Sequence, residues 1–350
     1  MFHPLRVSEV EQLTDDAVAV TFAVPPELRE AYRHLAGQHL TLRRSVGGEE
    51  IRRTYSICAP AVEAPDEPVL RVGIRVVDGG AFSTYACKEL AVGDTVDVME
   101  PMGRFVLAPR HGHFAAVVGG SGITPVLSIA ATLLAREPEA RFCLIRSDRS
   151  VASTMFLDET ADLKDRYPER FQLVTVLSRE EQQSGLPSGR LDHERLSALL
   201  PALLPVADID GWFLCGPFGL IQGAERALRG LGVDRDRIHQ EIFHVDAAPA
   251  PEAAAATPAH ATLTATLDGR SGNWQVHEGD TLLETLLAAR ADAPYACKGG
   301  VCGTCRAFLV KGEVRMERNF ALEPEETEAG YVLACQSHPT TAEVELDFDR

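Results

Sequence analysis

Short apolar runs separated by turn residues dominate the first third of the chain. Six of these runs are candidate β-strands, and one short helix is expected near Phe82 to Leu90. The expected strands are Leu5 to Val10, Ala17 to Val24, His39 to Arg43, Ile51 to Cys58, Leu70 to Val77 and Thr95 to Val98. Six strands with one helix predict a small closed antiparallel barrel over residues 1–109.

From Phe114 onward the pattern changes to apolar runs that alternate with longer segments of helical periodicity. The apolar runs are Ala115–Val118, Phe142–Ile145, Leu173–Leu177 and Trp212–Cys215. The helical segments are Pro125–Ala135, Ala152–Tyr167, Asp192–Leu200 and Phe218–Leu231. This alternation predicts an α/β domain with an open parallel sheet over residues 110–245.

A change in composition marks the start of a third region. Residues 246–260 contain 8 Ala and 3 Pro and too few large apolar side chains for a core, so they are predicted to form a linker. Beyond the linker, residues 261–350 predict an α+β domain. Its strands are expected at Leu263–Leu267, Asn273–His277 and Val344–Phe348, and its helix follows a capping box of Thr281 and Glu284.

Composition and charge narrow the class of protein. With 45% apolar and 24% charged residues the chain is typical of a globular protein, and a net charge of −17 argues against nucleic acid or an anionic membrane as partner. No basic and then apolar signal sequence follows Met1, so a cytoplasmic location is expected. The uncharged stretch 115–135 is long enough for a bilayer, but its glycines and Pro125 favour a strand, a loop and a helix.

Four cysteines near the C-terminus carry the strongest chemical signal. Cys297, Cys302 and Cys305 have the spacing Cys-x4-Cys-x2-Cys, and Cys335 follows after 29 residues. This spacing is typical of plant-type [2Fe–2S] ligands, and the glycines between them let main-chain N–H groups face the cluster sulfurs. A structural zinc site and unliganded thiols are the alternatives, although zinc sites usually pair their ligands. Disulfides fit poorly with a chain that has no export signal.

Two short motifs in the barrel region suit a flavin. Arg53-Thr54-Tyr55-Ser56 offers a cation, an aromatic face and a hydroxyl on one strand, where alternate side chains share a face. Gly79-Gly80-Ala81-Phe82-Ser83 precedes the short helix, and its main-chain N–H groups are suited to a pyrophosphate. The alternatives are ordinary side chains at a barrel rim and an ordinary turn with a helix cap.

The motifs of the second region lie where its strands are expected to end. Gly119-Gly120-Ser121-Gly122-Ile123-Thr124-Pro125 links the first strand to a helix, with Thr124 as the expected N-cap, and presents N–H groups to a dinucleotide. Cys215-Gly216-Pro217 is expected at the carboxyl edge of the same sheet, where ligands of such folds bind. Ser178-Arg179 and Arg149 suit an adenosine 2′-phosphate, although arginines are also common on surfaces.

In this order the motifs resemble the ferredoxin–NADP reductase superfamily fused to a plant-type ferredoxin, and Glu241 and Phe243 also fall at family positions. Four stretches more narrowly resemble the reductase subunits of phenylacetyl-CoA epoxidases, the multicomponent oxygenases of phenylacetate degradation. They are 21–25, 37–42, 294–302 and 330–333. The resemblance implies a β-grasp fold for the ferredoxin domain, bound FAD, NADPH as electron donor and a di-iron oxygenase as electron acceptor.

The resemblance also implies roles for individual residues. Flavin contacts are implied for Arg53, Tyr55, Ser56, Ile74, Gly80, Phe82 and Ser83, with Thr54 in the same motif. The nucleotide site would be lined by Gly120, Gly122, Thr124, Arg149, Ser178, Arg179, Cys215 and Gly216. Thr124, Cys215 and Glu241 would shape the hydride-transfer pocket, with Phe243 near the flavin. Relatives carry Tyr-Gly-Asn-Arg where this chain has Arg146-Ser147-Asp148-Arg149, and Arg in place of Ile242, so NADH stays open as the donor.

The expected chemistry is electron transfer in which the cofactors react and the protein positions them. Electrons would pass in pairs from NADPH to FAD, then singly to the cluster and outward, and no general acid or base is required. Domain order leaves FMN open as the flavin and another oxygenase open as the acceptor. A different class of alternative is a non-catalytic, zinc-stabilised assembly module on a disabled reductase scaffold.

Overall fold

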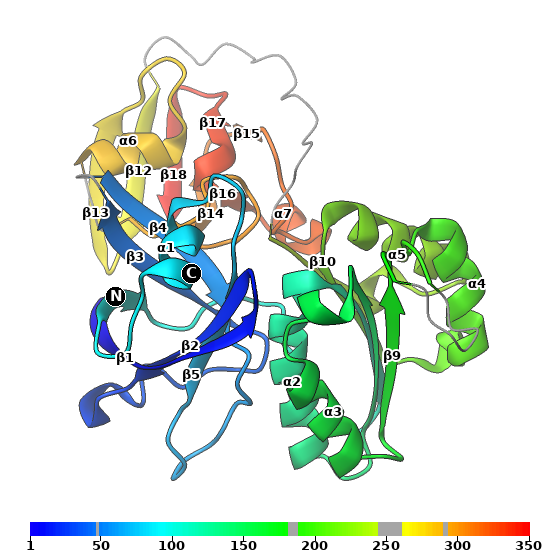
Figure 1. Cartoon of the computed structure of the whole chain (residues 1–350). Helices are drawn as coiled ribbons and strands as arrows, with labels where there is room; N and C mark the ends of the chain where they lie inside the picture. The colour runs from blue at the N-terminus through cyan, green and yellow to red at the C-terminus, as the bar shows by residue number, and fades with distance from the viewer. Residues whose placement is uncertain (47–48, 181–187, 244–260, 290–292) are drawn as a thin grey trace. The chain divides into compact units, whose positions relative to one another are not determined.

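A computed structural model describes residues 1–46, 49–180, 188–243, 261–289 and 293–350 (Figure 1). The chain forms two compact units, Met1–His244 and Val245–Arg350. The predicted linker 246–260 lies outside the described residues.

Six antiparallel strands and one short helix open the first unit, as the apolar pattern predicted. The strands form one sheet in the order β4-β3-β6-β1-β2-β5, and a bridge between Ile57 and Val72 joins the end of β4 to β5 and closes the barrel. Leu5, Val20 and Leu40 are fully buried inside it, because alternate side chains of each strand face the interior. The elements are β1 (Phe2–Thr14), β2 (Ala17–Ala23), β3 (His39–Val46), β4 (Glu49–Ser56), β5 (Leu70–Arg75), α1 (Ala81–Lys88) and β6 (Thr95–Met99), with a 3-10 turn at Pro26–Leu28.

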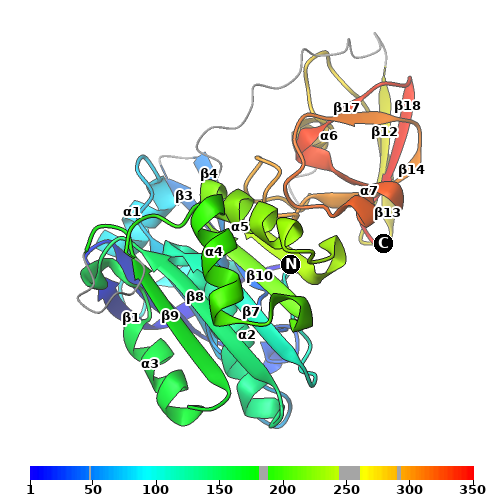
Figure 2. The ribbon, with the colours of Figure 1, turned by 90° about the vertical axis from the view of Figure 1, so that its right-hand side faces the viewer.

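A five-stranded parallel sheet forms the other half of this unit, in the order β11-β10-β7-β8-β9. Helices α2 and α3 cover one face, and α4 and α5 cover the other, where Figure 2 shows them in front of the sheet. The strands are β7 (His113–Gly119), β8 (Arg141–Asp148), β9 (Phe171–Leu177), β10 (Gly211–Gly216) and β11 (Ile238–Ile242). The helices are α2 (Ile123–Arg136), α3 (Leu157–Arg166), α4 (His193–Leu203) and α5 (Phe218–Gly230), with 3-10 turns at Gly120–Gly122, Val151–Ser153, Val206–Asp208 and Arg235–Arg237.

The structure corrects three details of this half. Strand β11 was not predicted from the sequence, because His239, Gln240 and Glu241 give it a polar centre. The helix expected over Ala152–Tyr167 starts only at Leu157, since Phe156 takes the left-handed conformation with φ 54° and interrupts it. Thr124 is not an N-cap, because α2 already begins at Ile123 and the Thr124 hydroxyl donates back to the Ser121 carbonyl at 2.9 Å.

The uncharged stretch 115–135 forms strand β7, a 3-10 turn and helix α2, as predicted. No helix among the described residues combines the length and the apolar character needed to cross a membrane.

The second unit is a mixed sheet packed against a helix. Its strand order is β13-β12-β18-β14-β16, with β12 and β18 parallel at the centre. The predicted capping box is confirmed: the Thr281 N–H donates to Glu284 at 2.8 Å, and the Glu284 N–H donates to the Thr281 hydroxyl at 3.2 Å. The elements are β12 (Thr262–Leu267), β13 (Arg270–Gln275), α6 (Leu282–Ala289), β14 (Arg306–Lys311), β15 (Val314–Met316), α7 (Pro324–Glu328), β16 (Tyr331–Leu333), β17 (Ser337–Pro339) and β18 (Glu343–Asp347), with a 3-10 turn at Ala334–Gln336.

Candidate redox and nucleotide sites

The order of strands in the parallel sheet reverses between β7 and β10. The glycines singled out in the sequence lie at the carboxyl ends of these two strands. Gly120 has φ +55° and Gly216 has φ +146°, backbone conformations that favour glycine. A Cβ atom at Gly122 would lie 2.1 Å from the Cys215 carbonyl oxygen. The start of α2 therefore approaches the end of β10 more closely than any side chain permits. Ligands of open α/β sheets bind at such switch points.

Four of the predicted residues meet next to this point. Cys215 on β10 is paired in register with Glu241 on β11. The Ser56 hydroxyl at the end of β4 donates to the Glu241 carboxylate at 3.0 Å, which links the barrel to the sheet. Thr124 packs toward the barrel, since a Cβ at Gly73 of β5 would lie 2.7 Å from its methyl carbon. Thr124, Cys215 and Glu241, predicted as one group, thus gather with the predicted flavin residue Ser56 where the two halves touch.

His39 joins this group, although the sequence marked it only as part of a predicted strand and of the stretch 37–42, and gave it no role in the site. Its Nδ1 atom lies 3.9 Å from the second oxygen of the Glu241 carboxylate, and its buried Nε2 has no hydrogen-bond partner. The Glu241 carboxylate therefore faces a hydroxyl on one side and an imidazole on the other.

Cys215 is a neutral thiol in this setting. Burial, and then the nearby Glu241 charge, raise its pKa well above the ordinary value for a cysteine. A nucleophile would need the thiolate, so Cys215 can contribute shape and polarisability here but little nucleophilic reactivity.

The predicted flavin residues come from β4, from β5 and from the turn and first residues of α1. Arg53 is exposed and its guanidinium donates to the Arg52 carbonyl at 2.7 Å, while the Tyr55 ring lies 5.7 Å from the Phe82 ring. The Ser83 hydroxyl accepts from the Val77 N–H at 3.1 Å and donates to the Gly80 carbonyl at 3.1 Å, which fixes the turn before α1.

These side chains fit a flavin in chemistry. Arg53 supplies a cation, Tyr55 an aromatic face and Ser56 a hydroxyl, all from one strand, while Thr54 between them is partly buried. Ile74 and Phe82 are 0% and 1% exposed and belong to the barrel core, so their side chains reach a ligand only if the core opens.

A cavity of about 620 Å³ lies at the carboxyl edge of the parallel sheet. Four predicted nucleotide residues line it: Gly120, Arg149, Ser178 and Arg179. Three charged residues that the sequence did not point to also line it: Asp16 and Arg75 from the barrel, and Arg190 before α4. Four arginines in one cavity suit a ligand that carries several negative charges.

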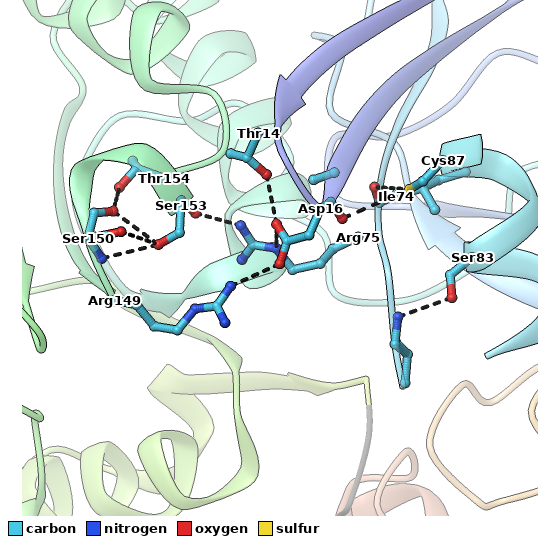
Figure 3. A network of polar contacts seen from close by, with 12 residues as sticks. Thr14, Asp16, Ile74, Arg75, Ser83, Cys87, Arg149, Ser150, Ser153 and Thr154 are labelled. Atoms are coloured by element: carbon cyan, nitrogen blue, oxygen red, sulfur yellow. Dashed lines mark hydrogen bonds and ion pairs between the residues drawn. The ribbon is translucent and has the colours of Figure 1, made fainter. Parts of the chain in front are cut away.

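Asp16 connects the barrel to the wall of this cavity (Figure 3). Its carboxylate accepts from the Thr14 hydroxyl at 2.8 Å, from Arg75 Nε at 3.1 Å and from Arg149 Nη2 at 2.9 Å. Arg75 in turn donates to the Ser153 carbonyl. Burial raises the pKa of Asp16, but the Thr14 hydrogen bond and the two arginines outweigh it and hold the pKa below its usual value.

Arg146 and Asp148 of the motif at the end of β8 form a buried ion pair. Arg146 is 1% exposed and donates to Asp148 at 2.8 Å, to the Met155 carbonyl at 2.9 Å and to the Thr160 hydroxyl at 3.2 Å. Arg146 thus ties β8 to the segment before α3, while Arg149 at the end of this motif faces the cavity.

The four cysteines of the second unit lie in two hydrogen-bonded pairs. The Cys302 thiol donates to Cys297, which with nearby main-chain N–H groups lowers the pKa of Cys297 below its usual value. A bond with Cys305 lowers the pKa of Cys335 in the same way. Among the described residues, no three Cys, His, Asp or Glu side chains gather as ligands of one ion. Two pairs of thiols fit two iron atoms that each hold two thiolates.

Main-chain donors surround these sulfur atoms. The Gly299 N–H donates to Cys297 Sγ at 3.3 Å, and Gly300 and Gly303 take φ of +75° and +69°. The side-chain amide of Gln336 lies 3.6 Å from Cys335 Sγ. Such donors stabilise anionic sulfur, so the loop fits a thiolate-bound cluster.

Profiles of three protein families match successive parts of the chain. An oxidoreductase FAD-binding domain matches residues 4–107, an oxidoreductase NAD-binding domain matches 117–226, and a 2Fe-2S iron-sulfur cluster binding domain matches 265–340. The three matches follow the barrel, the parallel sheet and the cysteine-bearing unit.

Known proteins align with the chain over nearly their full length. The chain is 44% identical to one component of the 1,2-phenylacetyl-CoA epoxidase of Escherichia coli, over 99% of this chain and 98% of that one. It is 33% identical to the ferredoxin reductase component of 3-ketosteroid-9-alpha-monooxygenase of Rhodococcus rhodochrous, over 98% and 96% of the two chains. The fold is that of phthalate dioxygenase reductase, with a TM-score of 0.62 at 24% identity and coverage of 99% and 98%. The chain therefore belongs to the ferredoxin reductase superfamily, and is an oxidoreductase with FAD-binding, NAD-binding and 2Fe-2S domains on one polypeptide.

Proposed function

We propose that this protein is the NADPH-dependent reductase of a phenylacetyl-CoA epoxidase, a di-iron oxygenase. In this role it takes electrons from NADPH and passes them through FAD and a [2Fe–2S] cluster to the oxygenase subunits. The observation that carries the proposal is the 44% identity to the Escherichia coli protein over nearly the whole of both chains.

The arginines of the cavity support NADPH over NADH. Arg149, Arg179 and Arg190 line the space at the end of the sheet where the adenosine end of the nucleotide is expected. Among the described residues, the guanidinium groups of Arg179 and Arg190 have no hydrogen-bond or ion-pair partner. A 2′-phosphate adds two negative charges to the nucleotide and would give both groups a partner.

Each predicted site residue has a place in this proposal. Bound FAD supplies the exchange between a two-electron hydride and single electrons, and the cluster carries these one at a time. The residues that would hold the flavin are Arg53, Thr54, Tyr55, Ser56, Ile74, Gly80, Phe82 and Ser83. Those that would hold the nucleotide are Gly120, Gly122, Thr124, Arg149, Ser178, Arg179, Cys215 and Gly216.

Four further assignments complete the proposal. Glu241 orients the Ser56 hydroxyl through their 3.0 Å hydrogen bond and, with Thr124 and Cys215, shapes the place of hydride transfer. Phe243 packs against the core beside it. The cluster ligands are Cys297, Cys302, Cys305 and Cys335. The proposed domain limits are 1–109, 110–245 and 261–350, with a linker over 246–260.

The reductase of another oxygenase is the competing function. The 33% identical Rhodococcus relative is a component of a monooxygenase that acts on 3-ketosteroids by its name. The two candidates share every cofactor and differ only in the acceptor, so the acceptor has to be tested directly.

The deciding experiment combines the purified protein with the oxygenase subunits of a phenylacetyl-CoA epoxidase. NADPH is expected to drive epoxidation of phenylacetyl-CoA faster than NADH does at equal concentration. Mass spectrometry of the extracted flavin should give FAD, and iron and acid-labile sulfide should each approach two per chain, as a [2Fe–2S] cluster requires.

Each part of the proposal fails on a separate result. Reduction of cytochrome c without epoxidation would point to a different oxygenase. Epoxidation driven equally by NADH would remove the NADPH preference, and FMN in the extract would remove FAD. A colourless protein that binds zinc would overturn the reductase function itself.

A further inference from the structure

Arg149 is a proposed nucleotide ligand that already has an anionic partner, Asp16. Its Nη2 atom lies 2.9 Å from Asp16 Oδ2, and the two side chains are 48% and 37% exposed. Asp16 belongs to the turn between β1 and β2 of the barrel, whereas Arg149 follows β8 of the parallel sheet. The ion pair therefore joins the two halves of the first unit at the cavity wall, as Figure 3 shows.

Asp16 is fixed from the side away from Arg149. Its other carboxylate oxygen accepts from Thr14 at 2.8 Å and from Arg75 at 3.1 Å, and Arg75 is itself held by the Ser153 carbonyl. Arg75 is 16% exposed. Of the two members of the ion pair, Arg149 is consequently the one free to turn toward a ligand.

Two more arginines line the same cavity, and their guanidinium groups have no partner within the part of the chain that the structure describes. Arg179 follows β9, and Arg190 lies next to Gly219 at the start of α5. A phosphate that enters the cavity therefore meets two available cations and a third that must first leave a carboxylate.

We propose that the Asp16 carboxylate competes with the 2′-phosphate of the nucleotide for Arg149. This carboxylate holds Arg149 until a phosphate replaces it, and so selectively weakens the binding of nucleotides that carry the extra 2′-phosphate. The inference rests on the proposed nucleotide site and adds a residue from the barrel that sets its affinity. When Arg149 leaves Asp16 to bind the phosphate, one contact between the barrel and the sheet is also broken.

The sign of the effect follows from charge. Asp16→Asn removes one negative charge from the cavity, yet keeps an oxygen that can accept from Thr14 and Arg75. A dianionic phosphate several ångström away then loses a repulsion and gains a free Arg149. With solvent screening, this predicts binding of a 2′-phosphate about three- to tenfold tighter.

The test uses two probes that differ only in the 2′-phosphate. Calorimetry on the flavin- and cluster-loaded protein would measure dissociation constants for adenosine 2′,5′-bisphosphate and for adenosine 5′-monophosphate. Asp16→Asn should tighten the bisphosphate about three- to tenfold and change the monophosphate less than about twofold, and the gain should shrink as salt is raised. Asp15→Asn is the matched control, because it removes the same charge from an exposed neighbour outside the cavity.

Arg149→Gln supplies the second arm. Without Arg149, the Asp16 carboxylate has no arginine to withhold from a phosphate. Asp16→Asn should therefore tighten binding of the bisphosphate clearly less in the Arg149→Gln background than in the wild-type background. The inference is overturned if Asp16→Asn tightens bisphosphate binding equally in both backgrounds, or tightens the two probes equally. Either result would mean that Asp16 acts only through its general negative charge.

The outcomes separate the inference from the function it rests on. If wild type prefers the bisphosphate and Asp16→Asn leaves that preference unchanged or weaker, the competition by Asp16 is refuted while the NADPH site stands. If wild type binds the two probes equally, the 2′-phosphate site itself is wrong, and the inference falls with it.

Discussion

Buried thiols illustrate how single residues are tuned in the first unit. Cys215 beside Glu241, Cys58 in the barrel and Cys143 in strand β8 are 0%, 2% and 0% exposed. Burial raises the pKa of Cys58 and of Cys143 to about 12, and that of Cys215 well above its usual value. A thiol next to the proposed hydride path therefore stays protonated across the physiological range, which keeps a nucleophile away from a reactive nicotinamide.

The reactivity of these thiols should depend on pH in a defined direction. At pH 9 a cysteine with a pKa of about 12 is roughly 0.1% thiolate, whereas an unfolded cysteine is about half thiolate. Alkylation of Cys143 by iodoacetamide at pH 9 should thus be at least about 500-fold slower in the native protein than in urea. Mass spectrometry of the labelled peptides measures both rates.

The same pKa shift links these thiols to stability. Because the folded pKa lies above the unfolded one, the stabilising contribution is complete below about pH 9 and is lost as pH rises toward 12. Native labelling of Cys143 should accelerate about tenfold per pH unit over that window, while labelling in urea levels off. A native rate that already saturates at pH 9 would contradict the burial argument.

At the scale of elements, the contact between α2 and β10 decides the shape of the proposed nucleotide site. Gly122→Ala would place its Cβ 2.1 Å from the Cys215 carbonyl oxygen, an atom of the main chain that cannot turn aside. The helix start and the strand end must move apart, at an expected cost of about 2–3 kcal/mol in the free energy of unfolding. Thermal unfolding followed by flavin fluorescence should show a lower midpoint.

Gly230→Ala is the matched control for this prediction. Gly230 is the last residue of α5, and a Cβ there would meet nothing within 4 Å. The substitution should leave stability unchanged or raise it by about 0.5–1 kcal/mol, since alanine loses less backbone entropy in a helix. If both alanines behaved alike, close approach would not be the reason for glycine at position 122.

The apolar pattern was sufficient to predict those elements that are apolar along nearly their whole length. Strands such as β7 and β10 have buried residues at nearly every position, and both appear close to their predicted limits. Strand β11 was not predicted because its centre is polar. The late start of α3 depends on one left-handed residue, Phe156. Local periodicity does not report either feature.

The candidate sites show the same division between local and distant information. The glycine loop and the cysteine spacing are visible as motifs, because their residues are close in sequence. Asp16 and Arg149 are 133 positions apart, and Ser56 and Glu241 are 185 positions apart. Nothing in the sequence around Asp16, His39 or Arg190 signals that the fold brings them to a site.

At the scale of the whole molecule, the chain joins two compact units that carry different cofactor sites. The proposed flavin and nucleotide residues lie in Met1–His244, and the four proposed cluster cysteines lie in Val245–Arg350. Hydrophobic cores are separate too: Leu263, Leu283 and Val344 belong to a cluster confined to the second unit. Loss of the iron–sulfur cluster should therefore leave the chemistry of the first unit intact.

Cys335→Ser tests this serial arrangement. It replaces one of the two sulfurs in the pair with Cys305, so iron content should fall and cytochrome c reduction by NADPH should drop to near background. Ferricyanide accepts electrons from flavin directly, so NADPH-driven ferricyanide reduction should persist close to the wild-type rate. Cys87→Ser, the same substitution in the first unit, should keep both activities, because the contacts of that thiol to main-chain carbonyls are weak, at 3.6 and 3.9 Å, and a hydroxyl can replace them. Simultaneous loss of both activities in a Cys335→Ser protein that remains folded and retains FAD would mean that flavin reduction depends on the cluster, and the relay could not be serial.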